Sequence, residues 1–195
     1  MTALALGCSH TAGVGVDSRD CYVQALGRML DKDITNLGVP GGNAAHLQRL
    51  LVQALTLPTK PDFVIAQWPN PIRRTMWHNK KAVDENIHNA SAAFQQLLRA
   101  GEQNFMQPWI DVIIVCNLLC RTAAVPIINI MIEDVAPEYH AQLAKEHIQL
   151  HVDRKLPGET WLMDSTASDN LHHSAKCHKQ WAERLFGLLN EHTTR

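Results

Sequence analysis

The chain has 195 residues, of which 46% are hydrophobic and 19% are charged. This length and composition are typical of one globular domain and exclude an intrinsically disordered chain. The 18 Lys and Arg residues nearly balance the 19 Asp and Glu residues, and the net charge of -1 argues against a protein that binds nucleic acid or an anionic membrane surface.

The sequence also lacks the signals of a membrane or secreted protein. No stretch approaches the roughly 20 apolar residues that a membrane span needs, and the first ten residues have no basic region of the kind that opens a secretory signal. The five cysteines are an odd number and are scattered along the chain. We therefore expect reduced thiols and a cytoplasmic protein.

The first half of the chain alternates short apolar runs with amphipathic segments. Short strands are expected where an apolar run ends at glycine or proline, and helices where apolar residues recur every three or four positions. The pattern predicts strands at 2–7, 34–37 and 63–68, and helices at 18–31 and 44–55.

The second half continues the alternation after a long helical stretch. Residues 81–121 are expected to form two helices broken near Gln107-Pro108, because proline interrupts a helix. The remaining predictions are a strand at 126–132, a helix at 137–147, a weaker strand at 148–152 or 161–163, and a final helix at 174–190.

Apolar strands that alternate with helices predict a parallel sheet covered on both faces. In such sheets ligands bind beyond the carboxyl ends of the strands. Candidate functional residues are therefore sought just after each strand, at 7–15, 38–43, 68–74 and 164–178.

The loop after the first strand carries a serine in a tight, glycine-bounded turn. Within Gly7-Cys8-Ser9-His10, such a turn holds the Ser9 hydroxyl out of the core. Serine is a weak nucleophile that needs a neighbouring base. The other interpretation of Ser9 at this stage is a turn or cap residue.

A matching base lies just before the final helix, in Asp169-Asn170-Leu171-His172. A carboxylate three residues before a histidine can fold back onto it, fix its tautomer and stabilise its cation. Asp169 as an acid at a helix N-terminus and His172 as a solvated loop residue remain the alternative.

Two further loops offer hydrogen-bond donors. Glycine at 41–42 lets backbone N–H groups approach a substrate, and Asn70 follows the third strand with a side-chain amide. Together with the Ser9 N–H, one glycine N–H and the Asn70 amide would make a three-donor oxyanion hole.

The order of these four pieces resembles the SGNH (GDSL-type) hydrolase family. The resemblance runs from Gly7 to about Leu185 and rests on Gly-x-Ser, Asn36-x-Gly-x-x-Gly41, an Asn after the third strand and Asp-x-x-His. It implies a flavodoxin-like three-layer α/β/α sandwich with a mostly parallel five-stranded sheet. The expectation is one such domain over 1–195 with a helical insertion around 72–121.

The resemblance also implies roles for individual residues. Ser9 is the expected nucleophile of a carboxylic ester hydrolase, His172 its base and Asp169 the residue that orients the base. Ser9, Gly41 and Asn70 are the expected oxyanion donors. The implied substrate is a small-molecule, saccharide or lipid ester, with a small acyl or acetyl group preferred, and no cofactor or metal is implied. The sequence does not specify the oligomeric state.

The third motif departs from the family pattern, which reads Gly-x-Asn-Asp where this chain has Trp-Pro-Asn-Pro. We expect Trp68 to wall the substrate pocket, and Arg73 to lie near the same end of the sheet and bind substrate. If Asn70 does not face the site, Arg73 or Arg74 is the candidate source of positive charge.

Two other functions stay open. The first is a metal site, because sulfur and imidazole ligands suit zinc; its candidate ligands are Cys8, His10, His172, His173, Cys177 and His178. No pair of them has a familiar zinc-site spacing. The second is a non-catalytic binding or structural module that keeps the fold.

Overall fold

The computed structural model of the protein describes residues 3–71, 74–78, 81–85, 102–131, 137–152 and 172–193. Its centre is a sheet of five parallel strands in the order β2-β1-β3-β6-β7. The strands are β1 (Ala3–Gly7), β2 (Ile34–Gly38), β3 (Val64–Trp68), β6 (Ile127–Met131) and β7 (Leu150–Val152). This is the strand order of flavodoxin-like folds.

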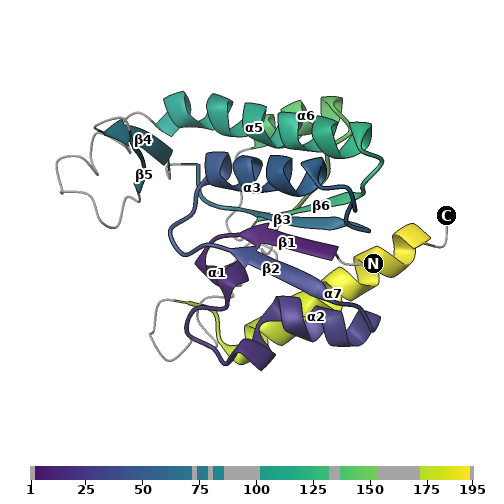
Figure 1. Cartoon of the computed structure of the whole chain (residues 1–195). Helices are drawn as coiled ribbons and strands as arrows, with labels where there is room; N and C mark the ends of the chain where they lie inside the picture. The colour runs from purple at the N-terminus through teal and green to yellow at the C-terminus, as the bar shows by residue number, and fades with distance from the viewer. Residues whose placement is uncertain are drawn as a thin grey trace.

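Helices cover both faces of this sheet, as Figure 1 shows. One face is covered by α3 (Ala44–Thr56), α5 (Glu102–Thr122) and α6 (Pro137–Lys145), and the other by α2 (Tyr22–Leu30) and α7 (Ala175–Thr193). The predicted three-layer α/β/α sandwich is confirmed, with all five strands parallel. No helix in the described ranges is both long and apolar enough to cross a bilayer.

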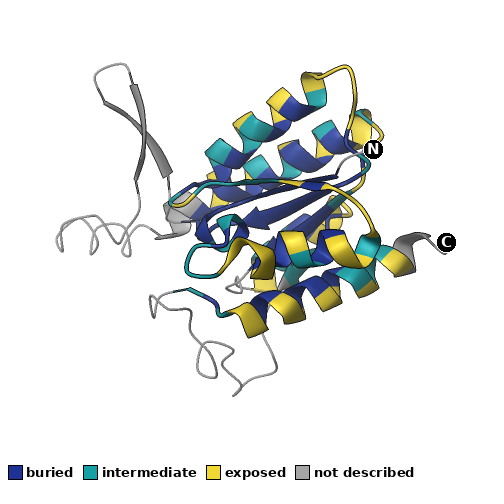
Figure 2. Ribbon diagram, turned by 60° about the horizontal axis from the view of Figure 1, so that its bottom comes forward, coloured by how far each residue is buried: buried dark blue, intermediate teal, exposed yellow. Residues whose placement is uncertain are grey.

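The two faces of the sheet have separate hydrophobic cores because successive strand residues point to opposite sides. In β1, Leu4 and Leu6 belong to the core beneath α3 and α5, whereas Ala3 and Ala5 belong to the core beneath α2 and α7. The inner strands β1 and β3 are buried along their whole length and β6 along nearly all of it, whereas only Ile34 of the edge strand β2 is buried (Figure 2). Burial of a leucine such as Leu6 contributes about 1.5–3 kcal/mol to folding.

Most of the predicted elements agree with the structure to within a few residues. The prediction is wrong for residues 81–85, which form strand β5 (Lys81–Glu85), paired antiparallel with β4 (Arg74–His78). The expected break near Gln107-Pro108 is also wrong, because α5 continues through Pro108. The expected insertion at 72–121 therefore contains a hairpin and α5, while 86–101 and the alternative strand at 161–163 lie outside the described residues.

Two short helical turns complete the described fold. α1 (Ser9–Ala12) follows β1 directly, and the 3-10 helix η1 (Ser18–Asp20) precedes α2. Asp17 caps η1 by accepting the N–H of Arg19 at 2.9 Å. α1 lies beyond the carboxyl end of β1, where the parallel-sheet rule places a ligand site (Figure 1).

Candidate active site

The candidate site lies where the order of the strands changes direction. The chain goes from β1 to β2 on one side and later returns to β3 on the other side of β1. Loops that leave β1 and β3 therefore diverge, and the space between them is the usual binding crevice of an open parallel sheet. The loop after β1 begins with Cys8 and leads into α1, whose first residue is Ser9.

α1 gives Ser9 a defined orientation although the helix has only four residues. Its turn is closed by bonds from Ala12 N to Cys8 O at 3.0 Å and from Val14 N to Ser9 O at 3.0 Å, and it ends at Gly13. The first N–H groups of a helix have no acceptor within that helix. Among the described residues the Ser9 N–H has no backbone acceptor, and the residue itself is only 7% exposed.

Gln67, near the end of β3, holds this turn from below. Its side-chain oxygen Oε1 accepts hydrogen bonds from Cys8 N at 3.1 Å, from Cys8 Sγ at 3.2 Å and from Thr11 Oγ1 at 3.1 Å. Its amide nitrogen Nε2 donates to Trp68 O at 3.2 Å. Gln67 and Thr11 are both buried, and a buried donor left without an acceptor costs about 1–3 kcal/mol. The two ends of α1 are therefore fixed by one amide.

The hydroxyl of Thr11 extends this network to α2. Because its proton goes to Gln67, the bond of 3.0 Å between Thr11 Oγ1 and Tyr22 Oη must be donated by Tyr22. Burial raises the pKa of the Tyr22 hydroxyl, which keeps its proton available for this bond. The backbone N–H of Tyr22 in turn donates to His178 Nδ1 at 3.1 Å, so the network reaches α7.

The carboxyl end of β2 packs directly against α1. Asn36 donates through Nδ2 to Thr11 O at 2.6 Å and accepts the Gly38 N–H at 2.9 Å. A Cβ atom at Gly38 would lie 2.3 Å from Ala12 N, so only glycine fits this contact. The second motif thus supports the turn that carries Ser9.

The two adjacent glycines in the turn after β2 have different roles. Gly42 N donates to Val39 O at 2.9 Å, and this bond closes the turn. Gly41 has a φ of 78°, in the left-handed region that favours glycine, and a Cβ built there would meet no atom within 4 Å. The Cβ direction of Gly41 therefore faces open space, whereas the N–H of Gly42 already bonds Val39 O.

The loop after β3 is tied to α5. Trp109 donates its indole N–H to Pro69 O at 3.0 Å, and Pro71 is buried. Asn70 lies between these two prolines and is partly exposed. Trp68 is 1% exposed and donates its indole N–H to Asn129 Oδ1 at 3.0 Å. The expected pocket wall at Trp68 is thus a core residue, because its side chain points to the α3 and α5 side of the sheet.

His172 lies beside the first residues of α1. The His10 ring contacts the His172 ring with centroids 5.1 Å apart and the His173 ring with centroids 4.5 Å apart. Since His10 directly follows Ser9, these contacts bring the predicted base to the segment that carries the predicted nucleophile. Asp169 and Arg73 lie outside the described residues.

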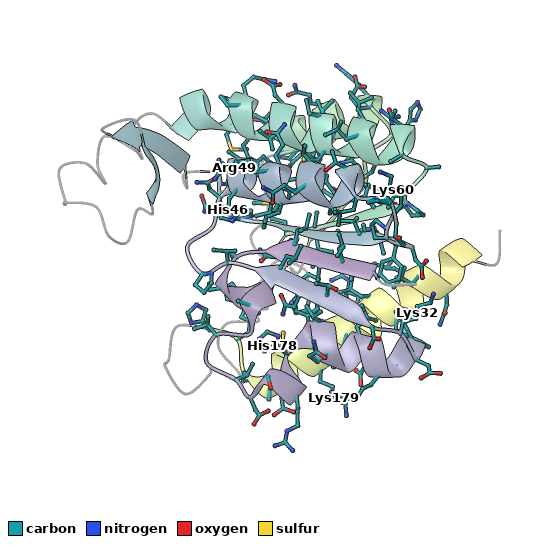
Figure 3. All side chains as sticks on the ribbon, in the orientation of Figure 1. Lys32, His46, Arg49, Lys60, His178 and Lys179 are labelled. Atoms are coloured by element: carbon teal, nitrogen blue, oxygen red, sulfur yellow. The ribbon has the colours of Figure 1, made fainter. Side chains whose placement is uncertain are left out.

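Two buried histidines next to this cluster are held neutral. Burial, and then the proximity of His172, lower the pKa of His173. Burial lowers the pKa of His178 to about 4, with smaller contributions from His173 and His172. His178 Nδ1 accepts the N–H of Tyr22, so its proton is on Nε2, which is buried and has no hydrogen-bond partner among the described residues. Figure 3 labels His178 near the start of α7.

The expected metal ligands do not converge within the described part of the chain. No three His, Cys, Asp or Glu side chains there are arranged to hold a metal ion. The Cys8 thiol donates to Gln67, and His178 Nδ1 accepts from the backbone. All five cysteines are free and buried, as expected for reduced thiols.

Gln67 is the residue at this site that the sequence analysis did not identify. Its signal was a single amide side chain in the otherwise apolar run FVIAQW. A polar residue inside a buried strand needs partners, and those partners indicate what the strand supports. In this chain they are Cys8 and Thr11, on either side of Ser9.

Comparison with known proteins gives structural but no sequence-level relatives. No protein-family model matches the sequence, and no curated protein sequence matches it. Among solved structures, the chain is similar to the psychrotrophic esterase EstA from a Pseudoalteromonas species, in a form inhibited by monoethylphosphonate. That match has a TM-score of 0.65 and 13% identity, and it covers 100% of this chain and 99% of EstA.

Two further structures give similar alignments. TesA has a TM-score of 0.64 and 15% identity, with coverage of 97% of this chain and 98% of TesA. A G-D-S-L-family protein from Desulfitobacterium hafniense has a TM-score of 0.60 and 15% identity, with coverage of 95% and 97%. At these identities the likeness establishes the fold: the chain has the three-layer α/β fold of EstA, TesA and this G-D-S-L-family protein.

Proposed function

We propose that the protein is a serine hydrolase of the SGNH (GDSL) type that cleaves a carboxylic ester. The observation that carries this proposal is the contact of His172 with His10, at the helical turn that begins with Ser9. The fold shared with the esterase EstA, and the order of Ser9, Asp169 and His172 in the sequence, support the same reaction class.

In the proposed reaction, His172 takes the proton of the Ser9 hydroxyl as the serine oxygen attacks the ester carbonyl carbon. The tetrahedral oxyanion accepts hydrogen bonds from the N–H of Ser9, the N–H of Gly41 and the Asn70 amide. The carbon–oxygen bond to the alcohol then breaks, and His172 gives its proton to the leaving alkoxide.

Deacylation uses the same groups with water as the nucleophile. His172 takes a proton from water, the resulting hydroxide attacks the acyl carbon, and the Ser9 oxygen leaves with the proton held by His172. Asp169 orients the imidazole and stabilises its cation. Gly41 rather than Gly42 is assigned as a donor because the Gly42 N–H already bonds Val39 O.

The test is covalent labelling of the intact protein with a fluorophosphonate. We expect Ser9 to be labelled and Ser9→Ala to be unlabelled, while Ser18→Ala, at an exposed serine of η1, should label like the wild type. His172→Ala should lower the labelling rate and kcat by at least about 10²-fold, and Asp169→Ala by a smaller factor. Equal labelling of wild type and Ser9→Ala would refute the proposal.

The substrate is proposed to be an ester of a small acyl group. Nitrophenyl esters of increasing acyl length and acetylated saccharides should be compared, with kcat/KM expected to be highest for acetate and to fall as the acyl chain lengthens. A higher kcat/KM for long acyl chains would contradict the small-acyl assignment without affecting the assignment of Ser9.

A further inference from the structure

We propose that Gln67 is the positioning residue that sets the orientation of the Ser9 turn for catalysis. The proposal rests on the proposed hydrolase function and names a group that does not touch the substrate. Its basis is the pair of bonds by which one side-chain oxygen holds the residues before and after the nucleophile: Cys8 N at 3.1 Å and Thr11 Oγ1 at 3.1 Å.

The strand that carries Gln67 is itself firmly placed. β3 lies between β1 and β6 in the sheet, and its pairing with β1 includes Leu6 with Ala66, one residue before Gln67. Gln67 points to the face opposite Trp68, because neighbouring strand residues alternate. Its amide therefore extends from a rigid element beneath α1, which is the kind of support that holds a reacting group in one orientation.

The neighbouring donors and acceptors determine which atom of the Gln67 side-chain amide is the oxygen and which is the nitrogen. The backbone N–H of Cys8 can only donate, so the Gln67 atom that faces it must be the oxygen. The nitrogen then faces Trp68 O, which can only accept. Thr11 donates a hydrogen bond to Gln67 and accepts one from Tyr22. The hydrogen bonds therefore run in one direction, from Tyr22 through Thr11 to Gln67. The amide cannot turn over without breaking bonds at both of its ends.

The glycine of the Gly-x-Ser motif fits this arrangement. A Cβ atom at Gly7 would lie 2.0 Å from Thr11 Oγ1 and 2.8 Å from Gln67 Oε1. Any side chain at position 7 would therefore occupy the space that the bond between Thr11 and Gln67 uses. The glycine before the nucleophile is required here because the amide must reach past it to α1.

Catalysis is sensitive to this support because a displacement of about 1 Å at a reacting group can cost about 10²-fold in rate. Removing the acceptor with Gln67→Leu should lower kcat about 10–100-fold and leave KM within about threefold of the wild type. Thr11→Val should also lower kcat. Thr11→Ser, which retains the hydroxyl, should restore kcat to near the wild-type value.

A buried amide elsewhere in the fold provides the matched control. Asn117 of α5 and Asn129 of β6 exchange hydrogen bonds at 3.0 and 3.1 Å, and Asn129 accepts the indole N–H of Trp68. Asn117→Leu should also destabilise the protein, since it leaves a buried amide without its partner. It should not change kcat, because the described side-chain bonds of this pair join it to Trp68, on the α3 and α5 side of the sheet, and not to Gln67.

The experiment measures kcat, KM and the fluorophosphonate labelling rate for the single variants and for Gln67→Leu combined with Thr11→Val. We expect the double variant to have nearly the kcat of Gln67→Leu alone, because both changes break the same support. The proposal would be overturned if the kcat losses of Gln67→Leu and Thr11→Val multiplied in the double variant. It would also be overturned by an unchanged kcat in Gln67→Leu, or by an equal loss of kcat in Asn117→Leu. If Gln67→Leu does not fold, the Thr11→Val and Thr11→Ser pair still decides it.

Amide hydrogen exchange separates this proposal from the assignment of Ser9. The amides of residues 8–12 should exchange faster in Gln67→Leu than in Asn117→Leu, whether or not the protein hydrolyses esters. A wild type that is not labelled at Ser9 would refute the hydrolase function alone. Unchanged exchange at residues 8–12 in Gln67→Leu would refute the positioning role.

Discussion

At the scale of single residues, Gly38 has the closest contact with backbone atoms near the candidate site. Gly38→Ala would place its methyl group 2.3 Å from Ala12 N and 2.7 Å from Thr11 C, both backbone atoms that cannot rotate away. We expect the free energy of unfolding to fall by about 2–3 kcal/mol, because overpacking forces the backbone to shift. Urea unfolding measures this change.

A glycine-to-alanine substitution at an exposed helix position should raise the free energy of unfolding instead of lowering it. Gly187 is exposed in α7, and a Cβ atom there would meet nothing within 4 Å. Gly187→Ala should therefore raise the free energy of unfolding by about 0.5–1 kcal/mol through helix propensity. A loss of stability at Gly38→Ala no larger than the change at Gly187→Ala would contradict the close contact between β2 and α1.

At the scale of elements, α5 contains a proline that the helix tolerates because of its packing. Pro108 is exposed, but the helix buries Trp109, Ile110 and Ile113 against the sheet. Proline removes one backbone hydrogen bond and its ring crowds the preceding turn. Pro108→Ala should raise the free energy of unfolding by about 1–3 kcal/mol, as measured by thermal or urea unfolding.

The neighbouring exposed residue supplies the comparison for Pro108. Gln107 donates through Nε2 to Asp111 Oδ1 at 2.8 Å, a bond along the helix surface. Gln107→Ala should lower the free energy of unfolding by no more than about 0.5 kcal/mol. An unchanged or reduced stability in Pro108→Ala would mean that the helix around position 108 depends on the proline.

The elements that the sequence predicted correctly are those with local signals. β1 and β3 are apolar runs ended by glycine or proline, and α3 has leucines at helical spacing. The hairpin of β4 and β5 was missed because its sequence has no clear alternation and no glycine turn. The continuity of α5 was missed because the burial of one face of the helix, from Met106 to Cys120, outweighs the effect of Pro108, and no local pattern expresses that burial.

Some features of the candidate site were likewise predictable from local sequence motifs, and others were not. Ser9 and His172 were predicted from motif order, and the contact between His10 and His172 supports their proximity. The core position of Trp68 and the bonds of Gln67 depend on which face of β3 each side chain occupies. A fully buried parallel strand shows no polar and apolar alternation, so the sequence could not assign those faces.

At the scale of the whole molecule, His178 links stability to pH. Its pKa is lowered from 6.5 to about 4 in the folded protein, so between these values the unfolded chain binds the additional proton. Stability therefore rises with pH in this window: the contribution is complete above about 6.5 and is lost as the pH falls toward about 4. The loss is on the order of 3 kcal/mol, and the lowered pKa of His173 acts in the same direction.

Urea unfolding between pH 7.5 and 4.5 tests this linkage. His178→Asn keeps an acceptor for the Tyr22 N–H but cannot take up a proton, so its stability should fall less steeply with acidification than that of the wild type. His147→Asn, at an exposed histidine, should retain the wild-type slope. Identical slopes for His178→Asn and the wild type would exclude His178 as the group responsible.

The position of β1 between β2 and β3 has a consequence for how the protein is made. β1 leaves the ribosome before β2 and β3, the two strands between which it must insert, and α7 emerges after every other described element. A nascent chain thus carries its proposed nucleophile, Ser9, well before its proposed base, His172, has been synthesised. Hydrolytic competence should accordingly arise only after His172 has emerged and α7, which follows it, has packed against α2.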